Sequence, residues 1–353
     1  MCYCRDFFLG KQDCNEYNVD IRKEREKYMN NLKKLICFTA VSLSCAVLAG
    51  CSLAKETKEK TPDVQGTELA KNPVITGADP FVLLHDGVYY MYATNAANGY
   101  VVYTSEDLKK WNPRGYCLTR EEVEGDYKFW APEVLYHDGR FYMVYSADEH
   151  LGIAVADSPL GPFRQEEKRF LSDKKEIDGH FFKDDDGSIY LYFSRYENGN
   201  GNLVYGAKMN EDMRSYDEST VKLLIPLSEE WETRWGATTE GPYMLKRNGT
   251  YYLTYSANGY SGHDYAVGYA TADTPLGDFK KYEGNPVLSK KGEIVGTGHH
   301  CFTTSLDGTQ MYIVYHRHNS VEEVEPRWIC IDKAYFKTSG DGKPDILVID
   351  GPN

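Results

Sequence analysis

A short hairpin phrase recurs five times along this chain of 353 residues. Each copy consists of an apolar run, a turn that ends in glycine, and a strand rich in aromatic residues. The turn glycines are Gly87, Gly139, Gly187, Gly249 and Gly308, at steps of 52, 48, 62 and 59 residues. A hairpin-based repeat of this length is typical of one blade of a β-propeller. The repeat therefore restricts the chain to a closed ring of small sheets.

The turns and strands around these glycines extend the pattern to whole blades. Asx-Gly pairs such as Asp86-Gly87 and Asn248-Gly249 suit two-residue hairpins, because both turn positions must tolerate positive φ. A second half-repeat follows, in which a strand such as 267–270 leads to a turn and an aromatic outer strand. We predict an all-β, five-bladed β-propeller with four antiparallel strands per blade. The predicted blades are 73–119, 129–172, 177–227, 238–289 and 297–349.

The segment before the repeats has a different character. Residues 1–28 are charged and lack a signal pattern, so we interpret them as an upstream extension outside the fold. Residues 29–51 read as a lipoprotein-type signal, with two lysines, an apolar run and a final Leu-Ala-Gly-Cys. The apolar run is too short for a stable membrane span, which favours a cleaved signal. A simple secretory signal or a short anchor helix are the alternatives.

This interpretation predicts lipidation of Cys51 and an exported, membrane-anchored lipoprotein on the periplasmic or cell-surface face. The linker 52–72 would hold the catalytic domain, residues 73–349, off the membrane, and the lipid would be its only membrane contact. The sequence carries no signal for an oligomeric state.

Charge and cysteine usage exclude some classes of protein. The formal net charge of −13 argues against nucleic acid as a partner, since binding to phosphates requires lysine and arginine. Beyond Cys51 only Cys117, Cys301 and Cys330 remain, and no CxxC or Cys/His metal spacing connects them. We expect these three thiols to be small buried hydrophobic groups.

In a propeller the first strand of each blade lines the central channel, so the residues that begin these strands meet at one mouth. Asp79 lies 8 residues before its turn glycine, while Asp178, Glu240 and His299 each lie 9 before theirs. Taken singly, the two aspartates could initiate turns, and Glu240 could be a hydrogen-bonding group of the channel. Together they predict one acidic pocket. Clustered carboxylates separate in pKa, which allows one to act as a base and another as an acid.

The motifs at these strand starts resemble those of glycoside hydrolase family 43. They are Ala78-Asp79-Pro80, Trp130-Ala131-Pro132-Glu133, Ile177-Asp178-Gly179, Thr239-Glu240-Gly241-Pro242 and Gly298-His299, one in each blade. The resemblance covers the chain from Pro73 to Phe336 and implies a five-bladed propeller that hydrolyses glycosides with inversion. It implies that Asp79 is the general base, that Glu240 is the general acid, and that Asp178 raises the pKa of the acid.

The resemblance also implies roles for three further residues. His299 matches a histidine that helps to hold a hydrated, structural calcium ion in the channel; the alternative is a histidine bonded within the channel wall. Arg327 resembles an arginine that contacts the sugar and the carboxylate of the base. Trp130 is a candidate stacking platform for a sugar, or else packs between blades. No cofactor is required for the implied reaction.

We therefore expect an exo-acting glycosidase whose substrate is a plant-type polysaccharide or oligosaccharide with terminal arabinofuranosyl or xylosyl residues. Exo-β-galactosidase or endo-arabinanase activity is the alternative within the same family. A non-catalytic carbohydrate-binding propeller on the cell surface is the alternative from another class.

Overall fold

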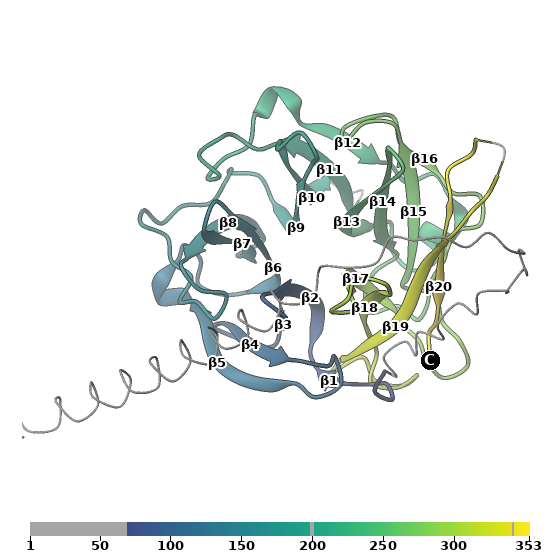
Figure 1. Cartoon of the computed structure of the whole chain (residues 1–353), viewed down its shortest axis with the longest axis horizontal. Coiled ribbons are helices and arrows are strands. Elements are labelled where there is room, and N and C mark those ends of the chain that lie inside the picture. Colours follow the sequence, from purple (N-terminus) through teal and green to yellow (C-terminus); the bar gives the residue numbers. More distant parts are fainter. Residues whose placement is uncertain (1–68, 198–200, 341) are drawn as a thin grey trace, which may run out of the picture. The chain divides into compact units, whose positions relative to one another are not determined.

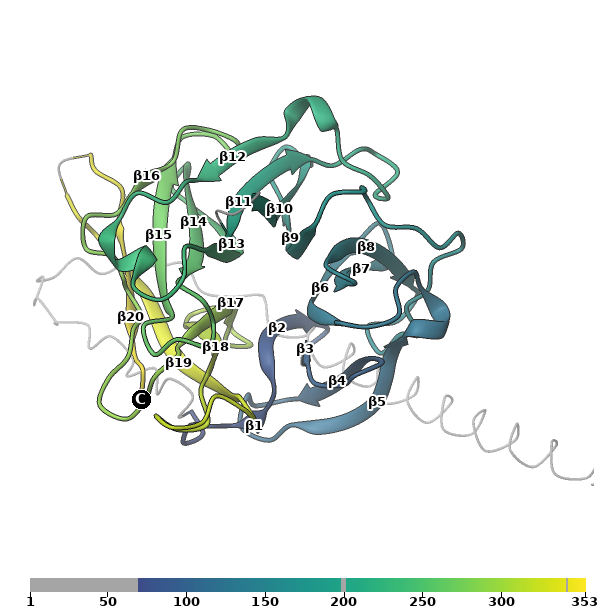
Figure 2. The ribbon, with the colours of Figure 1, turned by 180° about the vertical axis from the view of Figure 1, so that it is seen from behind.

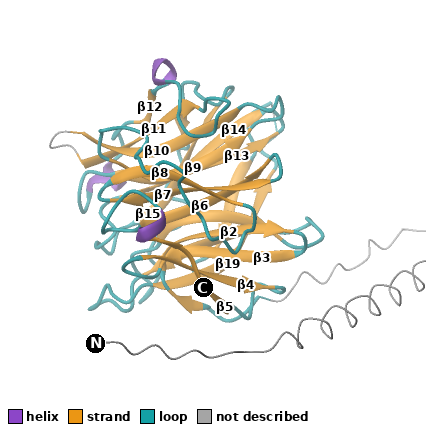
Figure 3. Cartoon of the chain, turned by 90° about the vertical axis from the view of Figure 1, so that its left-hand side faces the viewer, coloured by secondary structure: helices purple, strands orange, loops and turns teal. Residues whose placement is uncertain are grey.

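The computed structural model describes residues 69–197, 201–340 and 342–353, which lie in one compact unit from Val64 to Asn353. The predicted extension 1–28, the signal 29–51 with Cys51, and most of the linker 52–72 lie outside the described residues. Among the described residues, helix is limited to single turns at η1 (Arg120–Glu122), η2 (Glu218–Thr220) and η3 (Glu230–Thr233), as the side view shows (Figure 3). Within the described part, no helix is long and apolar enough to cross a membrane.

Five antiparallel sheets surround a central channel, and the predicted five-bladed propeller with four-stranded blades is confirmed (Figure 1). Blade 1 contains β2 (Ala78–His85), β3 (Val88–Thr94), β4 (Gly99–Ser105) and β5 (Asn112–Thr119). Blade 2 contains β6 (Trp130–His137), β7 (Arg140–Ala147) and β8 (His150–Ala156). Blade 3 contains β9 (Glu176–Lys183), β10 (Ile189–Glu197), β11 (Gly201–Lys208) and β12 (Lys222–Ile225). Blade 4 contains β13 (Thr239–Arg247), β14 (Thr250–Ala257), β15 (Ala266–Ala272) and β16 (Lys280–Lys281).

Blades 2 and 5 vary this plan. In blade 2 the outermost position is held by a single bridge between Val155 and Arg164. Blade 5 is built from β17 (Gly298–Thr304), β18 (Met311–Arg317), β19 (Trp328–Lys337), β20 (Ile346–Asp350) and β1 (Ile75–Thr76). The first strands β2, β6, β9, β13 and β17 lie innermost, and each contacts the first strands of both neighbouring blades (Figure 2). Residues that begin these five strands therefore share one mouth of the channel.

The glycine turns are of two kinds. In blades 1, 2 and 4, Asx-Gly pairs with positive φ connect directly paired residues, as at Asp86 (φ 48°) and Gly87 (φ 76°). In blades 3 and 5 the hairpin loops are longer, since Lys183 pairs with Ile189 and Thr304 with Met311. The Asx-Gly pair thus forms a two-residue turn in three of the five blades, while in blades 3 and 5 an Asp-rich or Ser-Leu segment lengthens the loop before the glycine.

The tyrosines of the second strands join neighbouring blades. Tyr92 donates to the carbonyl oxygen of Pro159 at 2.6 Å, and Tyr192 donates to that of Pro275 at 2.9 Å. Both rings are fully buried, so each contributes a large apolar area while its hydroxyl group finds a partner in the next blade. The high tyrosine content is explained mainly by this packing between blades rather than by ligand binding.

Both ends of the described chain close the ring in blade 5. The short strand β1 pairs with the start of β19, and β20 pairs with its far end. Asn72 forms two hydrogen bonds with the backbone of Ile331. The N–H of Ile331 donates to Asn72 Oδ1 at 2.8 Å, and Asn72 Nδ2 donates to the carbonyl oxygen of Ile331 at 3.2 Å. The buried carboxylate of Asp332 accepts hydrogen bonds from Asn72, Asn353 and Tyr315. One carboxylate thus connects both ends of the described chain to the last blade.

We expect Asp332→Ala to lower the free energy of unfolding by about 2–4 kcal/mol, because several donors lose a buried charged acceptor at once. Urea denaturation followed by circular dichroism would measure the change. Asp350→Ala, an exposed position on the neighbouring strand, is the matched control and should change stability by less than about 0.5 kcal/mol. Equal stability of both variants would contradict the proposed closure.

Candidate active site

One backbone position in each first strand bends the chain into the left-handed region. The five residues that share this position are Asp79 (φ 51°), Ala131 (φ 43°), Asp178 (φ 59°), Gly241 (φ 54°) and His299 (φ 44°). The pairing register with the second strand shifts at the same place in every blade. All five residues line one hollow at the channel mouth. The bend is therefore the local device that turns these positions toward the channel.

A hydrogen bond from the preceding blade holds each bend. The N–H of Ala131 donates to Thr94 Oγ1 at 2.9 Å, that of Asp178 to Ser146 Oγ at 3.1 Å, and that of His299 to Ser256 Oγ at 2.8 Å. The N–H of Asp79 donates to His316 Nδ1 at 3.2 Å. A left-handed conformation costs a non-glycine residue about 1–2 kcal/mol, so these bonds offset a real strain.

The count back from the turn glycines is right to within one residue. Asp79, Asp178 and His299 occupy equivalent positions, but the equivalent residue in blade 4 is Gly241, and Glu240 precedes it. The longer hairpin loops of blades 3 and 5 explain why equal counts do not mark equal positions. Glu240 therefore reaches the mouth from the position that Trp130 occupies in blade 2.

Asp79 is held as a charged carboxylate. Its Oδ2 accepts from Thr94 Oγ1 at 2.7 Å, and its Oδ1 accepts from Arg327 Nη1 at 3.1 Å. Burial alone would raise the pKa of Asp79, but the charge of Arg327, with His299 and His316 nearby, lowers it well below its ordinary value. The side chain is therefore an anion over the whole range near neutral pH, as a base that activates water must be.

Glu240 lies in the opposite electrostatic environment. Its Oε1 accepts from the hydroxyl group of Tyr265 at 2.9 Å, and its Oε2 accepts from Asn202 Nδ2 at 3.3 Å. Burial raises the pKa of Glu240 to about 7, against the lowering effect of these two hydrogen bonds. A carboxyl group that keeps its proton near neutral pH can donate it to a leaving oxygen.

Asp178 interacts electrostatically with both other carboxyl groups. Its Oδ2 accepts from the N–H of Gly241 at 3.2 Å, which ties Asp178 to the strand that carries Glu240. Burial, followed by the charges of Glu240 and Asp79, raises the pKa of Asp178 well above its ordinary value. Asp178 and Glu240 thus share one region of raised proton affinity, and their protons titrate as a pair.

The histidines of blade 5 border the same hollow. His299 Nδ1 lies 3.4 Å from Asp79 Oδ1 and 4.0 Å from Asp178 Oδ2, and burial lowers its pKa. His300 also lines the hollow. The volume of the hollow is about 20 Å³, which is room for about one water molecule. Among residues 69–197, 201–340 and 342–353, no group of three or more His, Cys, Asp or Glu side chains could hold a metal ion. The side chains therefore do not form the oxygen cage that calcium prefers, and calcium held through water at His299 stays a prediction.

The remaining residues predicted from the sequence also lie at or near the mouth. Arg327 reaches Asp79 although the two are 248 residues apart, and the ring of Tyr260 covers its guanidinium group at 4.7 Å. Trp130 is partly exposed, and its ring lies 5.5 Å from Lys128 Nζ. Glu133 also lines the hollow, but its Oε1 lies 2.6 Å from His180 Nδ1 and accepts from the N–H of Phe181 at 3.0 Å. These two bonds give Glu133 structural partners on β9.

Four residues that contact these carboxyl groups are not found by counting from the turns: Thr94, Asn202, Tyr265 and His316. Thr94 and His316 face the first strand at the bend, in the place of Ser146, Ser194 and Ser256 in the other blades. Each lies near the end of a second strand, one or two residues after its final tyrosine, so an alignment of the second strands could have identified them. Asn202 lies at the start of β11 and Tyr265 directly precedes β15, outside the two strands that flank the turn glycine.

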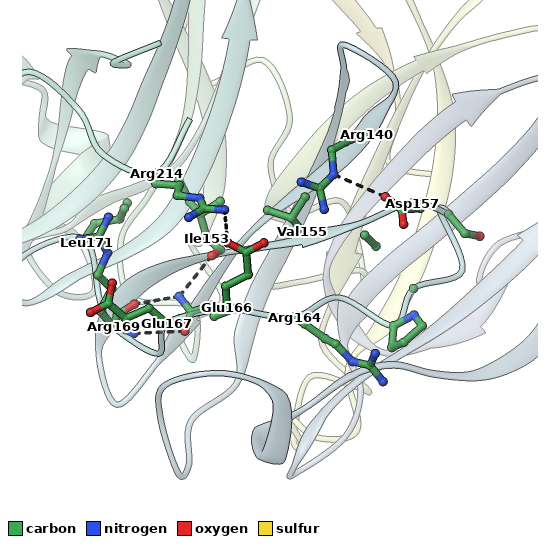
Figure 4. A pocket seen from close by; sticks show the side chains of 15 residues that line it. Arg140, Ile153, Val155, Asp157, Arg164, Glu166, Glu167, Arg169, Leu171 and Arg214 are labelled. Atoms are coloured by element: carbon green, nitrogen blue, oxygen red, sulfur yellow. Dashed lines mark hydrogen bonds and ion pairs between the residues drawn. The ribbon is translucent and has the colours of Figure 1, made fainter. Parts of the chain in front are cut away.

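A separate pocket of about 370 Å³ lies at the outer edge of blade 2 (Figure 4). Three of its four arginines are paired with acids: Arg140 with Asp157 at 3.4 Å, Arg164 with Glu122 at 2.7 Å, and Arg214 with Glu166 at 2.7 Å. None of the three carboxyl groups at the channel mouth lines the pocket. The pocket is therefore an arginine-lined groove at the incomplete edge of the blade, distinct from the acidic mouth.

A propeller that places a charged carboxylate and a protonated carboxyl group at one mouth has the base and the acid that glycoside hydrolysis uses. The family model of glycosyl hydrolases family 43 matches residues 70–342. The chain belongs to this family.

Named relatives and solved structures agree with this assignment. The chain is 30% identical over 310 residues to beta-D-galactofuranosidase xynD of Aspergillus niger, covering 80% of this chain and 86% of that protein. It is 27% identical to a xylosidase/arabinosidase of Bacteroides ovatus, covering 78% and 95%. A thermostable family-43 glycoside hydrolase has 41% identity and a TM-score of 0.73 over 80% of this chain and 96% of that structure. An endo-1,4-beta-xylanase of Bacteroides thetaiotaomicron has 40% identity and a TM-score of 0.73, covering 79% and 97%.

We expect Tyr265→Phe to raise the pKa of Glu240 further, because the carboxylate form loses a hydrogen bond while the protonated form loses little. A bond to a charged acceptor corresponds to a shift of about one unit. Carbon-13 NMR titration of the glutamate carboxyl groups, with Glu240→Gln to assign the signal, would measure it. The control is Tyr260→Phe, because Tyr260 covers Arg327 and no hydrogen bond joins its hydroxyl group to Glu240. A lower or unchanged value in Tyr265→Phe would contradict the role of this bond.

Proposed function

We propose that this chain is an inverting exo-glycosidase that removes terminal xylosyl or arabinofuranosyl residues from plant-type polysaccharides and oligosaccharides. The observation that carries the proposal is the opposite environment of Asp79 and Glu240, one held charged and the other held protonated. The relatives named xylosidase/arabinosidase and extracellular exo-alpha-(1->5)-L-arabinofuranosidase, the latter from Streptomyces chartreusis, support the choice of sugars and export of the enzyme.

In the proposed mechanism Asp79 takes a proton from a water molecule while the oxygen of that water bonds to the anomeric carbon of the substrate. Glu240 gives its proton to the glycosidic oxygen, whose bond to the same carbon breaks, so that the rest of the substrate leaves as an alcohol. Because water attacks from the face opposite the leaving oxygen, the anomeric configuration inverts. Asp178 modulates the proton affinity of Glu240 as the second member of the titrating pair, and it holds the strand of the acid through Gly241. Arg327 orients Asp79 and would bind sugar hydroxyl groups.

A second sugar class has a specific observation in its favour. The relative from Aspergillus niger that aligns over 80% of this chain is named for β-D-galactofuranoside hydrolysis. A panel of nitrophenyl β-xyloside, α-arabinofuranoside, β-galactofuranoside and β-galactopyranoside would therefore identify the sugar. NMR of the first-formed product tests the mechanism, since a retained anomeric configuration would rule out single displacement. Absence of hydrolysis across the panel and on oligosaccharides, with sugar binding intact, would favour a carbohydrate-binding propeller.

We expect Glu240→Gln to lower kcat on an oligosaccharide by about 10²–10⁴-fold, the usual contribution of a general acid. A dinitrophenyl glycoside, whose leaving group needs no proton, should lose far less. Steady-state kinetics on both substrates measures the difference. Glu230→Gln, at an exposed position, should match the wild type on both. Equal losses on the two substrates would contradict the assignment of Glu240 as the acid.

We propose further that the reaction needs no cofactor and that a hydrated calcium ion at His299 stabilises the channel. Chelation by EDTA should then lower Tm in the wild type and leave Tm of His299→Ala unchanged.

We also propose that the protein is exported and lipidated at Cys51. Labelling of cells with radioactive palmitate should mark the wild type, whereas label retained by Cys51→Ser would contradict the anchor.

A further inference from the structure

One position near the end of the second strands carries a different kind of side chain in blade 5. Thr94, Ser146 and Ser256 each supply a hydroxyl oxygen to the N–H of a bend in the following blade. In blade 5 the imidazole of His316 takes this place, and its Nδ1 accepts from the N–H of Asp79 at 3.2 Å. The bend that carries the proposed base is therefore held by a ring instead of a hydroxyl group.

A buried imidazole costs more than a hydroxyl group at this position. His316 is fully buried, and burial lowers its pKa to about 3. The ring is therefore neutral near pH 7, with one bare nitrogen and one N–H. Because Nδ1 accepts from Asp79, the proton lies on Nε2, which has no hydrogen-bond partner among the described residues. A buried polar atom without a partner costs about 1–3 kcal/mol, so the ring calls for a second role.

The face of the ring provides this second role. His316 is stacked on Tyr265, with ring centroids 5.6 Å apart and an angle of 12° between the planes. Tyr265 also lies against Gly298, which pairs with His316 across β17 and β18, and a Cβ atom at Gly298 would lie 2.4 Å from the tyrosine ring. A stacked aromatic pair contributes about 0.5–1.5 kcal/mol beyond its buried area. Tyr265 thus rests on blade 5 while its hydroxyl group donates to Glu240 Oε1 at 2.9 Å.

We propose that His316 is a positioning residue that links the proposed base to the proposed acid. Its Nδ1 holds the bend that presents Asp79, and its face supports Tyr265, the tyrosine that donates to Glu240. The inference rests on the proposed function, because it takes Asp79 as the base and Glu240 as the acid. One side chain of blade 5 thereby fixes two carboxyl groups that come from blades 1 and 4.

Two substitutions separate the two contacts. His316→Phe keeps an aromatic face for Tyr265 but removes the acceptor for the N–H of Asp79. We expect kcat to fall about 10–100-fold on both an oligosaccharide and a dinitrophenyl glycoside, because a misplaced base slows the attack of water whatever the leaving group. KM should change little, since the lost contact serves the transition state.

His316→Ser has the opposite effect on the two contacts. It keeps a hydroxyl acceptor, as blades 2 and 4 do at this position, but removes the stack on Tyr265. We expect kcat to fall about tenfold on the oligosaccharide and less than about twofold on the dinitrophenyl glycoside, whose leaving group needs no proton. A merely structural role would not produce different substrate patterns in the two variants.

His85 provides the matched control. Its ring also packs against a tyrosine, with a centroid distance of 4.5 Å to Tyr136, but His85 ends β2 whereas Asp79 lies near the start of that strand. His85→Phe and His85→Ser should leave kcat on both substrates within about twofold of the wild type. Equal losses on the two substrates in His316→Ser, or unchanged kcat in His316→Phe, would overturn the proposal.

NMR measurements without turnover separate this inference from the proposed function. If the wild type hydrolyses neither substrate, the proposed function fails, but the carbon-13 signal of the Glu240 carboxyl group should still move in His316→Ser and stay in place in His85→Ser. Nitrogen-15 NMR of the wild type needs no variant to fold. It should show the His316 proton on Nε2, with a nuclear Overhauser effect between its ring and that of Tyr265. An unmoved Glu240 signal in His316→Ser, a proton on Nδ1, or the absence of that effect would each overturn the link.

Discussion

The pairing of β1 with β19 is the interaction on which the rest of the molecule depends. It joins the two ends of the described chain in one blade, and it adds a main-chain link to the contact between the first strands of blades 5 and 1. The same pairing assembles the chemistry, because the N–H of Gly77 donates to the carbonyl oxygen of Arg327 at 3.0 Å. Two residues later in the chain, Asp79 meets the guanidinium group of that arginine. Closure of the ring and ionisation of the proposed base therefore have a common structural origin.

The five bends at the mouth share one backbone conformation but carry different side chains. Each bend stores strain and is fixed mainly by a side chain from the blade before it, so no blade forms its part of the mouth alone. Blade 4 differs in the partner of this bond. The N–H of the bend at Gly241 donates to the carboxylate of Asp178 rather than to the hydroxyl group of the equivalent serine, Ser194. This bond ties one titrating group to the strand that carries another.

The sequence allowed prediction of the fold because its signals are local and repeated. Turn glycines and alternating tyrosines depend only on hairpin geometry, and the strand starts converge by the symmetry of any propeller. The meeting of Asp79, Asp178, Glu240 and His299 follows from that symmetry. The contacts of Asn202 and Tyr265 with Glu240 could not be predicted, since they depend on how strands outside the first position of the blade approach the mouth. The exact register of Glu240 was also missed, because hairpin loops of unequal length make the turn glycine an imperfect origin for counting.

The five bends also divide into two kinds by what they carry. Asp79, Asp178 and His299 present large polar groups, whereas Ala131 and Gly241 present a methyl group and a hydrogen atom. In ring order Ala131 and Gly241 stand on either side of Asp178 and separate it from the neighbouring pair Asp79 and His299, and a Cβ atom at Gly241 would already lie 3.3 Å from the ring of His299. The small hollow at the axis therefore depends on the two small side chains, since five large side chains would fill it. The departure from fivefold symmetry keeps open, beside the carboxyl groups, a space of about the size of one water molecule.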